Sequence, residues 1–186
     1  MRVRLATVLC LVFLLAGCGK SNAPMDKALT LRNKILSSNG CSFRANITAD
    51  YGEKLYTFSV DCTTDKEGNL TFTVAEPATL TGITGKVDVN GGAITFDDKV
   101  LAFQTMADGQ VTPVSAPWLL MNTLRSGYLK GCTDGDDGFQ ISIDDSYEED
   151  ALHLNVNVEN SLPTSCEIVW QGRRVLTVTV ENFVYL

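Results

Sequence analysis

The stretch CSFRANITADYGEKLYTFSVDC, residues 41–62, decides the fold, because apolar and polar side chains alternate along both of its halves. Alternation with a period of two is typical of strands that bury one face. A two-residue loop at Tyr51 and Gly52 would join the halves as an antiparallel hairpin. In that register Cys41 lies opposite Cys62, and a slip by one residue would move every apolar side chain to the polar face.

Strand patterns continue along most of the chain and indicate an α+β fold that is mostly β. A turn at 66–68 returns the chain, so that Phe72 and Val74 extend the apolar face of the first hairpin. The later strand patterns lie at 85–90, 93–97, 100–105, 138–144, 152–158, 165–171 and 174–185. Their alternation predicts an antiparallel meander with one covered face.

Two segments have apolar residues at helical spacing instead, and they predict helices at 24–38 and 116–126. The residues that define these helices are Ala28, Leu31, Ile35, Trp118, Met121 and Leu124. No repeat or second domain is visible, so residues 24–186 are expected to form a single domain.

The N-terminus has the pattern of a secretory signal. Arg2 and Arg4 precede an apolar run at 5–15, which is shorter than the about 20 residues of a membrane-spanning helix. The run ends in Leu15-Ala16-Gly17-Cys18, which resembles the lipobox that lipoprotein signal peptidase cuts. We therefore expect residues 1–17 to be a lipoprotein signal peptide; the alternatives are an ordinary signal peptide with a chance cysteine, or an uncleaved anchor.

The lipobox resemblance implies that Cys18 carries lipid, with acyl chains such as palmitate, and becomes the new N-terminus. Residues 18–23 would then be a lipidated tether. Two or three acyl chains hold a protein firmly on a bilayer, since each buried CH₂ contributes about 0.8 kcal/mol. The expected location is the extracytoplasmic face of a cell membrane.

The cysteines of the mature chain predict two structural disulfides. Cys10 leaves with the signal peptide and Cys18 is lipidated, which leaves four cysteines and three possible pairings. The hairpin register favours Cys41–Cys62, and Cys132–Cys166 follows by exclusion. The alternative of four buried free thiols is less common in exported proteins.

The composition excludes several classes of function. Without Arg2 and Arg4, 13 basic residues remain against 22 acidic ones, a formal net charge of −9 that does not suit nucleic acid. The single histidine, His153, falls on the polar side of a strand pattern, and the sequence gives no sign of a Ser-His-Asp set, zinc spacing or phosphate-binding glycine loop. We therefore expect a non-enzymatic binding role without a cofactor.

An acidic segment resembles the start of a calcium loop, from Asp134 to Gly138. Calcium requires six or more oxygen ligands, and the twelfth position holds Asp145 where the usual glutamate would be bidentate. A flexible acidic turn is therefore favoured, and no metal site is expected. Residues 144–150 read as a second solvated acidic loop.

The chain resembles the LolA-like superfamily of exported lipoprotein carriers and their relatives, which includes the mycobacterial LppX and LprG lipoproteins. The features that match are the lipobox, the helix at 24–38 running into a long hairpin, the short helix near Pro117, and the final hairpin. That hairpin contains Leu162-Pro163, Cys166-Glu167-Ile168, Gly172 and a last strand from Val178 to Phe183. The resemblance covers nearly the whole mature chain.

This resemblance implies a strongly curved antiparallel sheet, a half-open barrel, with about two helices over its concave face. It also implies that an apolar cavity there binds an acyl chain or another lipid without covalent chemistry. The expected ligand-binding residues are Phe43, Phe58, Phe72, Trp118, Met121, Leu124 and Trp170. If these side chains fill a solid core instead, a structural or regulatory envelope lipoprotein with a protein partner becomes the better hypothesis.

Overall fold

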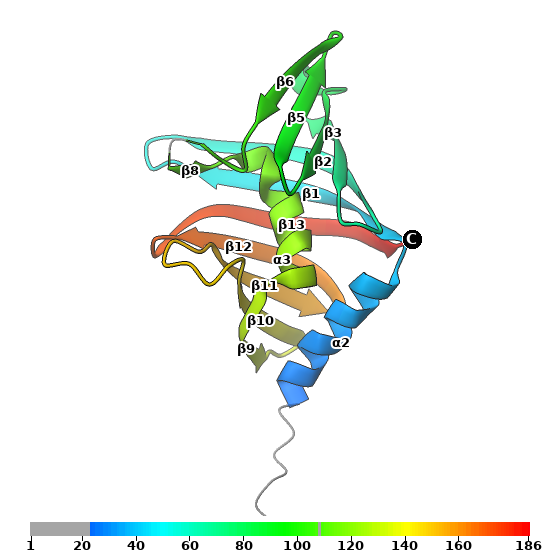
Figure 1. Cartoon of the computed structure of the whole chain (residues 1–186), viewed down its shortest axis with the longest axis vertical. Coiled ribbons are helices and arrows are strands. Elements are labelled where there is room, and N and C mark those ends of the chain that lie inside the picture. Colours follow the sequence, from blue (N-terminus) through cyan, green and yellow to red (C-terminus); the bar gives the residue numbers. More distant parts are fainter. Residues whose placement is uncertain (1–22, 108) are drawn as a thin grey trace, which may run out of the picture.

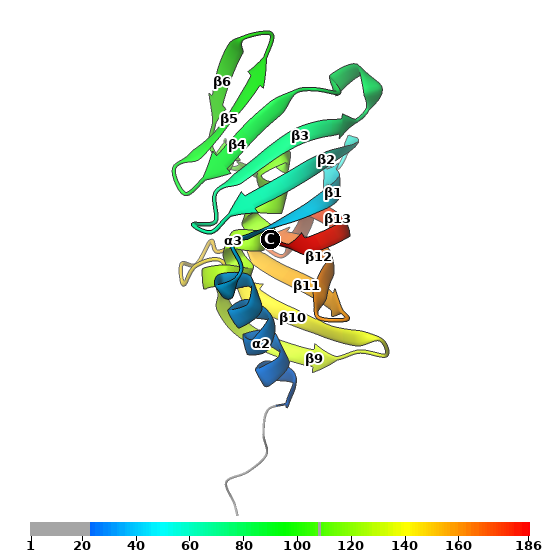
Figure 2. The same ribbon diagram turned by 90° about the vertical axis from the view of Figure 1, so that its right-hand side faces the viewer.

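Eleven antiparallel strands form one large sheet in the part of the chain that the structure, a computed structural model, describes, residues 23–107 and 109–186. The strand order is β6-β5-β4-β3-β2-β1-β13-β12-β11-β10-β9. The sheet is strongly twisted and curved and stays open along one side (Figures 1 and 2). The predicted α+β class and the half-open curved sheet are confirmed.

Two meanders form this sheet and meet at its centre. The first contains β1 (Gly40–Asp50), β2 (Leu55–Asp65), β3 (Leu70–Glu76), β4 (Thr84–Asp88), β5 (Gly91–Phe96) and β6 (Lys99–Phe103). The second contains β9 (Tyr128–Asp134), β10 (Gly138–Asp144), β11 (His153–Glu159), β12 (Leu162–Trp170) and β13 (Arg173–Tyr185). They are joined where β1 pairs with β13, so β6 and β9 are the two outer edges.

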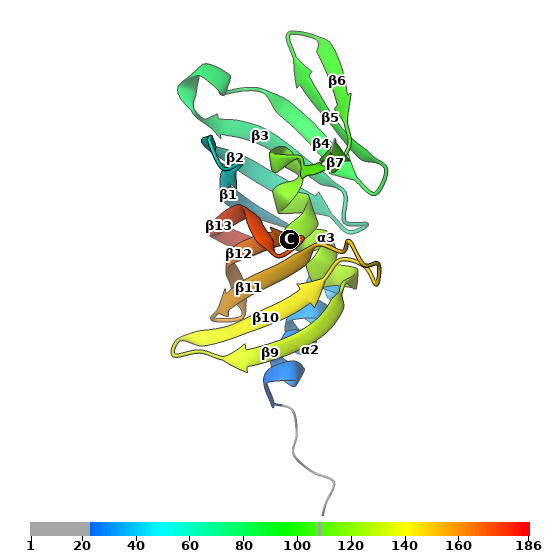
Figure 3. The same ribbon diagram turned by 90° about the vertical axis from the view of Figure 1, so that its left-hand side faces the viewer.

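The connection between the meanders runs from one outer edge of the sheet to the other. It contains a small ribbon of β7 (Met106–Ala107) and β8 (Gln110–Val111), a short 3₁₀ turn at Pro113–Ser115, and helix α3 (Ala116–Ser126). Because it has to cross the whole sheet, α3 lies over the middle of one face (Figures 1 and 3). We call the face beneath α3 the inner face and the opposite one the outer face.

Helix α2 (Ala23–Ser37) packs beside α3 and over β9. Its predicted apolar stripe is confirmed, since Ala28, Leu31 and Ile35 are all buried. The part of the chain described here contains no helix that is both long and apolar enough to cross a membrane. The predicted signal peptide and nearly all of the tether lie outside the described residues.

The register predicted for the first hairpin is wrong by two residues. Asp50 pairs with Leu55, which leaves a four-residue loop, and Phe43 rather than Cys41 lies opposite Cys62. The Asp50 carboxylate accepts a hydrogen bond from the Gly52 N–H at 2.7 Å, and Gly52 has a φ of 84° that suits glycine. A shift of two keeps each side chain on its own face, so the alternation could not distinguish the registers.

Candidate functional site

Five of the seven predicted ligand-binding side chains lie in the hydrophobic core. Phe43, Phe72, Trp118, Met121 and Leu124 are between 1 and 6% exposed, and all belong to one continuous cluster of buried residues. Side chains that line a water-sized cavity keep accessible surface even when the cavity is closed. These five therefore contact protein atoms, and the predicted cavity beneath α3 is filled by the protein itself.

Polar contacts hold α3 against α2 over this filled core. The Arg32 guanidinium donates from Nε to the Leu124 carbonyl at 2.8 Å and from Nη2 to the Gly127 carbonyl at 2.7 Å. Carbonyls at the end of a helix lack partners within that helix, so Arg32 supplies what the backbone cannot. An acyl chain could enter between α3 and the sheet only if this arrangement moved.

The other two predicted residues, Phe58 and Trp170, are only partly buried. Trp170 borders a hollow of about 330 Å³ at the end of the sheet, together with Tyr51, Val111 and Arg173. Burial raises the pKa of the Tyr51 hydroxyl, and the buried Trp170 Nε1 has no hydrogen-bond partner. The seven residues are thus divided between the core and separate places at its margin.

The inner face loses its cover toward β6. One row of side chains crosses five strands in register: Cys62, Phe72, Gly85, Ile94 and Leu101. Cys62 and Phe72 are 3% exposed, whereas Leu101 at the outer edge is 69% exposed. The apolar inner face therefore continues beyond the part that α3 covers.

Two glycines shape this uncovered part. A Cβ at Gly85 would lie 2.3 Å from the Phe72 ring, and one at Gly92 would lie 2.2 Å from the Phe103 ring. Both aromatic rings therefore lie directly on the backbone of the neighbouring strand, which the absence of a side chain permits. We call the side chains Ile94, Phe96, Leu101 and Phe103, which share the inner face of β5 and β6, the open apolar surface.

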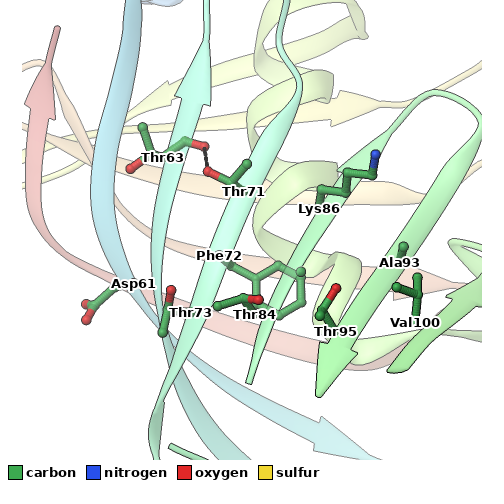
Figure 4. A pocket seen from close by; sticks show the side chains of 11 residues that line it. Asp61, Thr63, Thr71, Phe72, Thr73, Thr84, Lys86, Ala93, Thr95 and Val100 are labelled. Atoms are coloured by element: carbon green, nitrogen blue, oxygen red, sulfur yellow. Dashed lines mark hydrogen bonds between the residues drawn. The ribbon is translucent and has the colours of Figure 1, made fainter. Parts of the chain in front are cut away.

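The outer face of the same strands is hollowed and polar. A groove of about 630 Å³ runs across β2 to β6; Figure 4 shows the side chains that line it. Its lining contains five threonines, Thr63, Thr71, Thr73, Thr84 and Thr95, with Asp61 and Lys86. Threonine is favoured on exposed strand faces, and Asp61 is already paired with Arg44 at 2.8 Å, so the lining reflects strand structure more than a built site.

The second meander brings Ser142, His153 and Asp144 into line, which the sequence analysis did not anticipate. His153 Nδ1 lies 2.7 Å from Asp144 Oδ1, and Nε2 lies 3.2 Å from Ser142 Oγ. Burial alone would raise the pKa of the Asp144 carboxyl, but hydrogen bonds from His153 and Lys130 outweigh it and hold that pKa below its ordinary value. The sequence did place His153 on the polar face of its strand. Pairing that strand with 138–144 would have brought Asp144 and Ser142 close to it.

Ser142, His153 and Asp144 are hydrogen-bonded in the same order as a hydrolase triad, but the backbone around them differs from that of a hydrolase active site. Acyl transfer needs free N–H groups aimed at the developing oxyanion. β10, which carries Ser142 and Asp144, is paired with β9 on one side and β11 on the other, so its backbone groups are engaged in the ladder. The three residues thus form a polar tie on the outer face.

The predicted disulfides are not formed, since all four cysteines are free thiols. Cys132 and Cys166 are separated by β10 and β11, because the pairs Cys132 with Ile141, Ile141 with Val156, and Val156 with Cys166 form one row. Three strand spacings are about 14 Å, twice the Cα separation that a disulfide tolerates. Burial raises the pKa of the Cys62 and Cys166 thiols, which disfavours the reactive thiolate.

The acidic segments do not converge on a cation. Asp134 is paired with Lys27, and Asp144 is paired with His153 and Lys130. Over residues 23–107 and 109–186, no group of three or more His, Cys, Asp or Glu side chains is arranged to hold a metal ion.

Solved structures share this architecture at low sequence identity. A DUF1329 family protein from Desulfovibrio piger is 11% identical with a TM-score of 0.51, and the match covers 88% of this chain and 92% of that one. A domain from Vibrio parahaemolyticus assigned to outer membrane lipoprotein sorting is 6% identical with a TM-score of 0.50 over the same shares. A LolA superfamily protein from Nitrosomonas europaea is 10% identical with a TM-score of 0.46, over 86% of this chain and 93% of that one.

The two likenesses with TM-scores of 0.50 and 0.51 support the fold alone. Neither a protein-family model nor a curated protein sequence matches the chain.

Proposed function

We propose that the chain is an extracytoplasmic lipoprotein, anchored through Cys18, that binds a hydrophobic ligand non-covalently on the open apolar surface. The observation that carries this proposal is an apolar inner face that continues past its helical cover. Phe96 is 56% exposed and Leu101 is 69% exposed, while Ile94 and Phe103 beside them pack on the core. Contiguous exposed apolar surface of this kind typically marks a binding site.

An acyl chain suits this surface because it would cover side chains that offer no polar partner. Each methylene removed from water contributes about 0.8 kcal/mol. The ligand would lie over the partly buried ring of Phe103, which packs on the neighbouring strand because Gly92 has no side chain. None of the four residues of the open apolar surface is among the seven that the sequence led us to expect.

The start of α2, from which the proposed tether would extend, lies at the other end of the described part of the molecule. Helix α2 begins at Ala23, five residues after Cys18, so the tether spans at most roughly 18 Å. In Figure 1 the start of α2 and the β5–β6 hairpin occupy opposite ends of the long axis. The open apolar surface therefore lies far along the molecule from the point where the tether would begin.

The filled core favours a second function, that of a structural or regulatory envelope lipoprotein with a protein partner. Its support is the burial of Phe43 on the sheet and of the α3 side chains Trp118, Met121 and Leu124 that pack between the helix and the sheet, where a carrier would be expected to keep space. In this case the exposed side chains of β5 and β6 would contact protein rather than lipid.

Native mass spectrometry with organic extraction tests the first proposal, on the chain purified from its own host in detergent that preserves bound lipid. We expect a stoichiometric acyl species that is lost in Phe96→Glu and kept in Leu55→Glu. Leu55 is a matched control, because it is 67% exposed but lies outside the open apolar surface. A chain without bound lipid that stays unchanged on incubation with host lipids would contradict lipid binding and favour the protein-partner function.

A further inference from the structure

The β6 edge of the sheet offers an unpaired strand that exposes apolar side chains on both faces and carries one charge, Lys99, at its start. β6 reads Lys99-Val-Leu-Ala-Phe103, and it pairs with β5 on one side only. No strand among the described residues pairs with its other side. Such an edge is a ready template for a further strand, and most proteins cover or charge it.

The exposure of β6 is unusual on both sides of the sheet. Leu101 projects from the inner face, as its pairing with Ile94 shows, and Val100 projects from the outer face beside Thr95. Both side chains are more than two-thirds exposed, at 69% and 68%. A ligand within the curved sheet would account for the inner face alone, whereas an added strand would cover both.

We propose that β6 pairs antiparallel with β6 of a second copy of this chain, which joins two sheets across a two-fold axis. The register that pairs the whole strand sets Leu101 opposite Leu101 of the second copy. Val100 then lies opposite Ala102, and Lys99 lies opposite Phe103. This proposal does not depend on the lipid ligand.

The self-complementarity of β6 selects a second copy as the occupant. In this register no charge meets a like charge, and each Lys99 ammonium can lie over a Phe103 ring, a favourable cation–π arrangement. A two-fold contact between identical strands is isologous, so it closes at two copies and does not propagate into a fibre.

The same symmetry suits two chains anchored in one membrane. The two-fold axis that relates adjacent antiparallel strands is normal to the sheet, so both inner faces stay on one side. Helices α2 and α3 of both copies would then lie on that side (Figure 3 shows them in one copy). Both tethers could therefore reach a single bilayer.

Site-directed crosslinking tests the pairing and its register in membranes that contain the full-length chain. Leu101→Cys places the new thiol at the two-fold axis, where Cβ atoms of opposing residues approach to about 4.5–5.5 Å, within reach of a disulfide. We expect mild oxidation to convert this variant into a covalent dimer. Leu55→Cys, with nearly equal exposure, is expected to stay monomeric.

Analytical ultracentrifugation of the detergent-solubilised chain provides the second readout. We expect a mass of two chains for the natural sequence and of one chain for Val100→Lys, which places a charge on the outer face of the edge. Equal crosslinking of the two cysteine variants, a single-chain mass for the natural sequence, or a range of larger assemblies would each overturn the proposal. Because Val100 lies off the open apolar surface, Val100→Lys is expected to keep any bound lipid, which separates this test from the lipid proposal.

Discussion

The two edge strands of the sheet, β9 and β6, differ in how far the rest of the chain covers them. At the β9 edge, Lys130 forms a bulge in the pairing with β10, and α2 packs over the strand with Lys27 paired to Asp134. At the β6 edge the strand is regular and uncovered, with Lys99 as its one charge and with Val100 and Leu101 exposed. Bulges, charges and covering helices are how proteins prevent unwanted strand pairing. The bulge and the covering helix occur at the β9 edge and not at the β6 edge, which supports the proposal that β6 is the edge that binds.

The largest expected difference between the two ends is in stability. Leu154→Ala removes a fully buried side chain from β11 and should lower the free energy of unfolding by about 2–5 kcal/mol. Leu101→Ala makes the same substitution at the exposed β6 edge and should change the free energy of unfolding by less than about 0.5 kcal/mol. Urea unfolding at a concentration that keeps the chain monomeric measures both, and similar losses would show that the β6 end is packed in solution.

The next largest effect is expected for Arg32 of α2, which donates two hydrogen bonds to carbonyls at the end of α3. Arg32→Met leaves the Leu124 and Gly127 carbonyls without their donors, which should cost about 1–3 kcal/mol of unfolding free energy. Asn33→Met, at an exposed position on the same helix, is the control and should be nearly neutral. If both variants unfolded at the same urea concentration, the Arg32 hydrogen bonds would have no part in covering the inner face.

The smallest expected effect is the pH dependence of the stability that Asp144 of β10 contributes. Because the pKa of Asp144 is lowered on folding, its contribution to stability is present above its unfolded pKa, near 3.8, and is lost as the pH falls through the lower folded pKa. Asp144→Asn should therefore be less stable than the natural chain at neutral pH, and the difference should shrink below pH 3.8. A difference that stayed constant across that range would show that the carboxylate is not held by His153 and Lys130.

The alternation along 41–62 was sufficient to predict the first two strands and their buried faces, and the helical spacing at 24–38 and 116–126 added the helices of the α+β class. It could not fix the loop length, because both possible registers keep the same side chains inside. The disulfide prediction depended on that loop and on exclusion, so it failed with the register. Only the strand order shows that Cys132 and Cys166 lie three strands apart.

The candidate site was harder to predict, because coverage by α3 is a property of tertiary structure. Large apolar residues such as Phe43 and Trp118 occur both in the lining of lipid cavities and in packed cores, and sequence alone cannot tell the two apart. One signal for the bare edge was present, since residues 100–103 are all apolar and do not alternate. Such a run fits a strand that is covered on both faces, and the proposed pairing of β6 with a second copy would supply that cover.

Hydrogen–deuterium exchange tests most directly the claim that the β6 end is the binding end. The chain purified with its natural ligands and partners should be compared with the same chain after delipidation and dilution to the monomer. We predict faster exchange across residues 91–103 after this treatment, with no change at residues 128–134. Unchanged exchange at 91–103, or a change confined to the segment beneath α3, would contradict the account.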